Sequence, residues 1–121
     1  MKELKALIVE DDLVSSRILE LIFKKNEITT VANLSSADQI LELISSHAPD
    51  FIIMDVMIEG DIDGVEAAEK IRQISNVFIM FLTGQEDPNT VSRIGRISNS
   101  QLILKPYLHR EIIATIKSEL L

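Results

Sequence analysis

Short apolar runs alternate along the chain with longer stretches in which apolar residues recur at helical spacing. The runs are rich in branched and aromatic side chains, which predicts buried strands over residues 6–9, 28–32, 51–54, 77–82 and 102–104. Helices are predicted over residues 13–25, from Ser35 onward, over residues 64–74, from Asp87 onward and from Leu108 onward. This alternation predicts one parallel sheet with helices on both of its faces.

Two details of the predicted helices bear on how they pack. The apolar residues of the helix over residues 13–25 lie at helical spacing, which predicts that they face the sheet. These residues are Leu13, Val14, Ile18, Leu21 and Ile22. Ser35 and Ser36 precede the second helix, and their hydroxyl groups predict an N-cap there.

The run over residues 77–82 is the most hydrophobic in the chain, which makes it the best candidate for a central strand.

Charged and polar side chains follow four of the five predicted strands. Glu10 and Asp11 follow the first strand, and Asp55 follows the third. Thr83 and Lys105 follow the fourth and fifth strands. Ligands of open parallel sheets bind outside the carboxyl ends of the strands. We therefore expect these five residues to gather at one edge of the sheet.

Three of these residues are acids, and their charges repel strongly when they are partly removed from water. Either some of the acids are protonated or a cation compensates them. Carboxylate oxygens suit Mg²⁺, which retains several waters and often binds one or two carboxylates together with a phosphate. A metal ion and the ammonium group of Lys105 could neutralise a phosphoryl group while a carboxylate attacks it. An aspartate nucleophile that forms an aspartyl-phosphate is established chemistry.

The order of these residues resembles that in the receiver domain of two-component response regulators. The resemblance extends over residues 4–121 and rests on five motifs: residues 7–12 (LIVEDD), residues 53–57 (IMDVM), Asp63-Gly64, Thr83-Gly84 and Lys105-Pro106. It implies a three-layer α/β fold of the flavodoxin-like (βα)5 type. In such a fold a doubly wound, five-stranded parallel sheet carries helices on both faces. It also implies that residues 1–121 form a single receiver domain.

The resemblance implies a role for each clustered acid. Asp55 would accept the phosphoryl group and would share Mg²⁺ with Asp11. Glu10 would reach the ion through a water molecule, and Met57 would offer it a backbone carbonyl.

Other residues would contact the phosphoryl group itself. Thr83 would hydrogen-bond one phosphoryl oxygen, Gly84 would leave room for the group, and Lys105 would pair with its charge. The peptide bond between the lysine and its proline is commonly cis in this family. Met57 and Gln85, each two residues beyond a site residue, would tune the lifetime of the phosphorylated state by crowding or admitting the attacking water.

By the same resemblance, the phosphoryl donor would be a histidine kinase or a histidine phosphotransfer domain. Phosphorylation would change a partner-binding face. The domain would catalyse its own phosphorylation and slow dephosphorylation, and would not be a conventional enzyme. Dimerisation through the fourth and fifth helices is a habit of the family, so a homodimer is one expected assembly.

The chain departs from the family pattern at three positions. Asp63 follows Asp55 by eight residues, one more than in the commonest loop. Glu59 stands where a proline usually precedes Gly60. Longer loops of this kind resemble those of receivers linked to sensory or histidine-kinase domains. Leu102 occupies the position of an aromatic residue that often changes rotamer on activation.

Composition narrows the picture further. The chain has 121 residues, which suits one compact domain, and its net charge of −7 disfavours binding of nucleic acid by the chain itself. The absence of cysteine excludes disulfides and thiolate metal sites. Because we find neither a signal peptide nor an apolar stretch of about 20 residues, we expect a cytoplasmic location and no membrane insertion. The output would then lie on another domain or another protein.

Two other functions remain open at this point. One is a pseudo-receiver that binds a partner without phosphorylation, and the complete set of site residues argues against it. The other is a small flavodoxin-like or phosphatase-type enzyme, since a fold does not fix a function. A flavin site would need a phosphate-binding loop after the first strand, where acids stand instead. A phosphohydrolase would need a second acid at the position of Met57.

The remaining polar and methionine residues are interpreted as structural. Asp12 is expected to cap the first helix. Three acids are expected to form a solvated loop: Glu59, Asp61 and Asp63. Two histidines are expected at the surface: His47 and His109. Three methionines are expected to pack inside: Met54, Met57 and Met80. Four residues would make the fourth and fifth helices more basic: Arg93, Arg96, Arg110 and Lys117.

Overall fold

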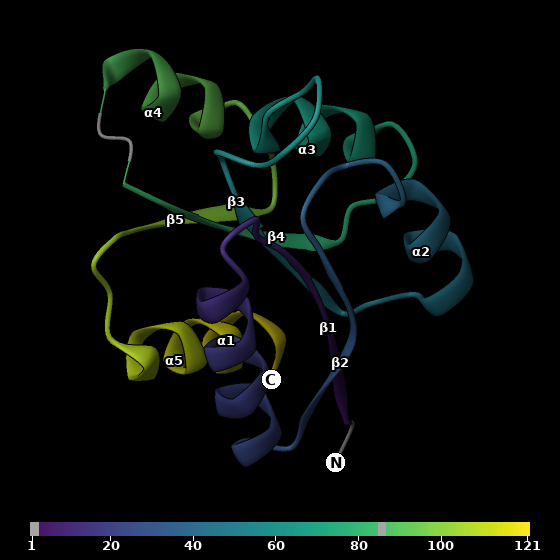
Figure 1. The fold of residues 1–121 in the computed structure, drawn as a ribbon, viewed down its shortest axis with the longest axis vertical. Helices are drawn as coiled ribbons and strands as arrows, with labels where there is room; N and C mark the ends of the chain where they lie inside the picture. Colours follow the sequence, from purple (N-terminus) through teal and green to yellow (C-terminus); the bar gives the residue numbers. More distant parts are fainter. Residues whose placement is uncertain (1–2, 85–86) are drawn as a thin grey trace.

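Five parallel strands form one sheet in the computed structural model, which describes residues 3–84 and 87–121 (Figure 1). The strands are β1 (Leu4–Val9), β2 (Ile28–Leu34), β3 (Phe51–Asp55), β4 (Phe78–Thr83) and β5 (Ser100–Leu104). Their order across the sheet is β2-β1-β3-β4-β5, so the winding changes direction once, after β2. This confirms the predicted doubly wound α/β fold.

Helices cover both faces of the sheet. They are α1 (Leu13–Lys25), α2 (Ile40–His47), α3 (Gly64–Arg72), α4 (Pro88–Gly95) and α5 (His109–Leu120). Figure 1 shows α1 and α5 on one side of the sheet and α2, α3 and α4 on the other. Each side has its own cluster of buried apolar residues. Among the described residues, no helix combines the length and the apolar composition that a bilayer span requires.

The middle strand, β3, supplies both clusters because successive side chains of a strand point to opposite faces. Ile53 packs in the cluster beneath α1 and α5, whereas Ile52 and Met54 pack in the cluster beneath α2, α3 and α4. All five residues of β3 are buried, and Asp55 is the last of them. The apolar run of β3 therefore fixes the point at which the Asp55 carboxylate leaves the core.

The observed strands agree with the predicted ones to within two residues at each end. Differences of two residues occur at three strands: β1 begins at Leu4, β2 extends to Leu34, and β5 begins at Ser100. The residues added to these strands include polar ones, such as Lys5, Asn33 and Ser100, which a search for apolar runs leaves out. The predicted central strand, β4, is interior, but β3 occupies the middle of the sheet.

The buried face of α1 differs from the prediction. Leu13, Val14 and Leu21 leave 63%, 68% and 61% of their surface exposed. The buried side chains of α1 are Ser16, Leu19 and Phe23. Ser16 is polar but lies on the buried face, so this face does not show up as apolar in the sequence. The Ser16 hydroxyl has a hydrogen-bond partner there, because it donates to the carbonyl of Leu13 at 3.1 Å. Of the five residues predicted to face the sheet, Ile22 packs against the core and the other four face outward.

The predicted serine N-cap of α2 is wrong. The helix begins at Ile40, and its N-cap residue, Gln39, makes no capping hydrogen bond through its side chain. Ser35 and Ser36 instead contact the loop after β3: Glu59 N donates to Ser35 O at 2.9 Å, and Ser36 and Glu59 form an isolated parallel bridge. The longer loop between β3 and α3 is thus attached to the loop between β2 and α2.

Candidate functional site

The carboxyl edge of the sheet brings together the side chains that follow β1, β3 and β5. Glu10 and Asp11 come directly after β1, and Asp55 ends β3. Each of these acids places a carboxylate oxygen within 4.8 Å of the others. Glu10 and Asp55 are buried, whereas Asp11 is exposed. The cluster is therefore open to solvent on the side of Asp11.

Lys105 lies between two of these acids. Its Nζ is 2.7 Å from Asp55 Oδ2 and 3.3 Å from Glu10 Oε1. The backbone sets this position, because Lys105 N donates to Thr83 O at 2.8 Å and continues the pairing of β4 with β5 by one residue. The peptide bond between Lys105 and Pro106 is cis, as the resemblance implies.

The electrostatics of the cluster favour a further positive charge. Burial raises the pKa of Glu10 to about 8, and the neighbouring carboxylate of Asp55 adds to the rise while Lys105 opposes it. Burial alone would lower the pKa of Lys105, but Asp55 and Glu10 raise it overall, so its ammonium stays charged. One ammonium faces three carboxyl groups.

The three acids fit a hard divalent cation. Glu10 Oε2 is buried and has no hydrogen-bond partner among the described residues. Buried polar atoms are normally paired, so this atom indicates a missing donor or ion. A cluster made of carboxylate oxygens matches the preference of Mg²⁺.

The residues after Asp55 hold its carboxylate in place. Met57 N donates to Asp55 Oδ1 at 3.1 Å. The Met57 side chain is 59% exposed, so the expectation that it packs inside is wrong. Met54 and Met80 are buried as expected.

Gly64, the first residue of α3, packs directly on the phosphoacceptor candidate. Gly64 N donates to Val56 O at 2.8 Å. A Cβ at this position would overlap the backbone carbonyl of Asp55 and would lie 2.9 Å from Met54 Cγ. The start of α3 can approach Asp55 this closely because residue 64 has no side chain.

The other residues implied by the resemblance lie at or beside the same edge. Thr83 ends β4 and is fully buried. A Cβ at Gly84 would meet no described atom within 4 Å. Leu102 is half-buried and packs on the cluster beneath α2, α3 and α4. Gln85, which would tune the phosphoryl lifetime, lies outside the described residues.

Two structural expectations hold, and one is wrong. Asp12 caps α1, and both histidines are exposed. Asp63, however, is not a solvated loop residue. It forms a capping box with Glu66 at the start of α3, and Arg93 of α4 donates to both of its carboxylate oxygens. The spacing Asp-x-x-Glu could have predicted the cap, but no pattern indicated the partner from α4.

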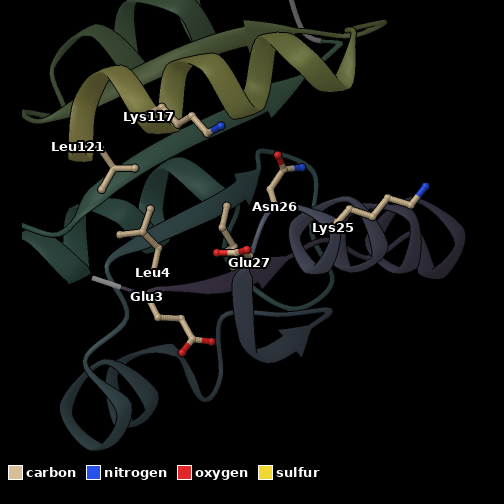
Figure 2. Close-up of a pocket in the computed structure, with 8 residues that line it drawn as sticks. Glu3, Leu4, Lys25, Asn26, Glu27, Lys117 and Leu121 are labelled. Atoms are coloured by element: carbon tan, nitrogen blue, oxygen red, sulfur yellow. The ribbon is translucent and has the colours of Figure 1, made fainter. Parts of the chain in front are cut away.

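A cavity of about 590 Å³ lies at the opposite end of the sheet (Figure 2). Leu4 and Ile28, the first residues of β1 and β2, line it together with the ends of α1 and α5. Figure 2 shows side chains of both charge signs around it, among them Glu3, Glu27 and Lys117. None of the residues predicted for the site lines this cavity.

Comparison with known proteins identifies the family. A model of the response regulator receiver domain matches residues 6–117. The chain belongs to this family. The receiver domain is 34% identical over 119 residues to the regulatory protein VanR of Enterococcus faecium, and the match covers 96% of this chain and 49% of VanR. It is 27% identical over 121 residues to the transcriptional regulatory protein YvrH of Bacillus subtilis (strain 168), with 99% of this chain and 50% of YvrH covered. The chain spans about half the length of these curated relatives.

Solved structures share the fold of this receiver domain. The response regulator receiver domain protein (CheY-like) from Methanospirillum hungatei JF-1 superposes with a TM-score of 0.88 at 19% sequence identity. The superposition covers 98% of this chain and 94% of the other. The arrangement of sheet and helices is therefore that of receiver domains.

Proposed function

We propose that this receiver domain accepts a phosphoryl group on Asp55 from a histidine kinase or a histidine phosphotransfer domain, in a Mg²⁺-dependent reaction. The observation that carries the proposal is the position of Asp55 Oδ2, 2.7 Å from Lys105 Nζ at the edge of a cluster of acids. Phosphorylation then changes a partner-binding face, and water slowly removes the phosphoryl group. In this proposal residues 1–121 act as one domain in the cytoplasm.

The transfer is a displacement at phosphorus. An oxygen of the Asp55 carboxylate forms the new bond to phosphorus, and the bond between phosphorus and the donor atom breaks. The donor atom keeps the electron pair of that bond, so a phosphohistidine donor returns to imidazole. Lys105 orients the carboxylate and then neutralises a phosphoryl oxygen. Thr83 donates its hydroxyl to another phosphoryl oxygen.

The acids provide the metal site of the proposal. Asp11 and Asp55 would hold Mg²⁺ directly, Glu10 would reach it through water, and Met57 would add its backbone carbonyl. When bound, the ion supplies positive charge next to the oxygens of the phosphoryl group.

The outward apolar side chains of α1 support a docking surface for the phosphodonor. Val14 and Ile18 are 68% and 40% exposed. Both lie on α1, which begins two residues after Asp11, so they are close in the chain to the exposed acid of the cluster. A donor that contacts this surface would bring its phosphoryl group to the open side of the cluster. Apolar side chains that water surrounds in the free domain gain free energy when a partner covers them.

The test of the proposal is labelling by acetyl phosphate with Mg²⁺, followed by the intact mass of the protein. We expect the wild-type domain to gain the mass of one phosphoryl group. Asp55→Asn should not be labelled, because the amide is a far weaker nucleophile than the carboxylate. Chelation of Mg²⁺ with EDTA should prevent labelling of the wild type.

Two outcomes would contradict the proposal. The first is an unmodified wild-type domain under conditions that label another receiver domain in parallel. The second is equal labelling of wild type and Asp55→Asn. Either result would favour an interaction module that works without phosphorylation at Asp55.

A further inference from the structure

Asp63 contacts two helices, α3 and α4, and its neighbour Gly64 packs on the end of β3. Its Oδ1 accepts from Glu66 N at 2.9 Å and so caps α3. The next residue, Gly64, contacts the backbone of Asp55 and donates to Val56 O. A displacement of Asp63 therefore moves the helix start that packs on Asp55.

Arg93 holds the same carboxylate from α4. Its two terminal nitrogens lie 2.8 Å from Asp63 Oδ2 and 2.9 Å from Oδ1, which is the bidentate geometry that makes arginine–carboxylate pairs directional. Both side chains are 27% exposed. Burial alone would raise the pKa of Asp63, but the hydrogen bonds from Arg93 and from the Glu66 amide lower it overall. The pair is therefore charged at neutral pH.

Among the residues that the structure describes, few other contacts fix α4. Two of its side chains, Thr90 and Ile94, are buried. A second guanidinium, that of Arg72 at the end of α3, donates to the carbonyls of Ser98 and Asn99 in the turn after α4. Among the described residues, these two arginine contacts lie at opposite ends of α3, and both hold α4 at or just beyond its C-terminal end. Figure 1 shows the two helices next to each other on the same face of the sheet.

We propose that the Arg93–Asp63 ion pair transmits the state of Asp55 to α4. A change at the Asp55 backbone shifts the start of α3, and Asp63 passes this shift to Arg93 and its helix. The inference rests on the proposed phosphorylation of Asp55 and adds the route by which α4 responds. It makes Arg93 a positioning residue that has no contact with the phosphoryl group.

The test uses amide chemical shifts measured by NMR with and without Mg²⁺ and beryllofluoride, which mimics a phosphoryl group on aspartate. In the wild type we expect shifts at Val56, beside Asp55, and at Ile94 in α4. In Arg93→Gln the shift at Val56 should remain, and the shift at Ile94 should fall to less than half. Asp63→Asn should give the same result, because asparagine keeps the helix cap and loses the charge.

Arg96→Gln is the matched control. Arg96 directly follows the same helix as its C-cap residue, and its side chain makes no hydrogen bond or ion pair with any residue that the structure describes. It should keep the full response of Ile94. The double variant Asp63→Asn/Arg93→Gln should lose no more of the response than either single variant, since both changes remove one interaction.

The outcomes separate the two proposals. No shift at Val56 in the wild type would overturn the proposed function and this inference with it. A shift at Val56 together with an equally large Ile94 response in wild type and Arg93→Gln would overturn this inference alone. Unchanged amide shifts of Ile112 in α5 would show that the variants are folded.

Discussion

The ammonium group of Lys105 is shared between the carboxyl groups of Asp55 and Glu10. It therefore compensates Glu10 only in part, and the pKa of Glu10 stays raised. Asp55 takes the shorter contact with the ammonium group, at 2.7 Å, and Glu10 is left at 3.3 Å with one buried oxygen unpaired. A buried carboxyl group with so little compensation destabilises the folded chain in its ionised form. The same residue is therefore unfavourable for stability and useful for attracting a cation.

Glu10→Gln should separate these two effects. Because the amide carries no charge, we expect the metal-free domain to gain about 1 kcal/mol of stability, which corresponds to a rise in melting temperature of several degrees. Mg²⁺ affinity should fall on the order of tenfold. Calorimetry of unfolding and a Mg²⁺ titration would measure the two changes. A loss of stability with unchanged Mg²⁺ affinity would contradict the role given to Glu10.

Gly64→Ala should damage the site from a position that has no chemical function. The new methyl group would push against the Asp55 carbonyl, so we expect a loss of about 1–3 kcal/mol of stability by urea unfolding. Labelling by acetyl phosphate should slow on the order of 10-fold or more, because small misplacements of a reacting group are costly. Gly95→Ala is the control, since a Cβ there meets no described atom within 4 Å. A labelling rate of Gly64→Ala equal to that of the wild type would argue against the importance of the close approach between Gly64 and the Asp55 carbonyl.

The gathering of Glu10, Asp11, Asp55 and Lys105 at one edge of the sheet was predictable, because each comes at the end of a strand whose apolar run is easy to recognise. Asp55 and Lys105 are the clearest examples. The pairing of Asp63 with Arg93 was not predictable in this way. Thirty positions separate the two residues, neither follows a strand, and their meeting depends on how α4 lies against α3.

At the scale of elements, α1 is where sequence and structure differ most. Amphipathic patterns indicate a buried face when the polar and apolar sides are distinct. In α1 the outward face carries more apolar residues than the face that packs on the sheet. The apolar pattern therefore predicted the wrong face of the helix as the buried one. The helix boundaries, in contrast, agree with the predicted residues 13–25, because capping by Asp12 and the strand pattern on either side define them.

The outward face of α1 gives a prediction about the phosphodonor. Val14→Ser combined with Ile18→Ser should slow phosphotransfer from the cognate histidine kinase by about 10-fold, the equivalent of one well-packed apolar contact. Labelling by acetyl phosphate should be unchanged, since that donor needs no protein contact. Ile74→Ser, which changes a 54% exposed side chain after α3, is the control. Equal slowing with both donors would place the defect in the site and not in docking.

At the scale of the molecule, the order of the strands decides what the site can contain. β1 and β3 are neighbours in the middle of the sheet, so their terminal acids meet. β4 lies next to β3, and β5 next to β4, so Lys105 must reach across to Asp55. Its long side chain makes this possible, which is a reason for lysine at the end of β5. The alternation of strands and helices predicted this architecture, but the lengths of the edge strands came only from their pairing.

Mg²⁺ should stabilise the whole molecule if the acids bind it. A ligand that binds the folded state at ten times its Kd adds about 1.4 kcal/mol of stability. We therefore expect the melting temperature to rise by several degrees between EDTA and saturating Mg²⁺. Asp11→Asn should remove most of the rise, and Asp38→Asn, an exposed acid outside the cluster, should keep it. An equal rise in both variants would indicate nonspecific screening of the net charge.

The absence of cysteine makes the molecule suitable for optical distance measurements between its two ends. The chain has no cysteine, so thiol-reactive dyes would attach only where a cysteine is introduced. Lys25 lines the cavity at the amino ends of the strands, and Asn89 is exposed on α4. A pair of dyes at Lys25→Cys and Asn89→Cys would leave the Asp55 cluster untouched. Energy transfer between them would follow the position of α4 in real time while a kinase acts on the domain.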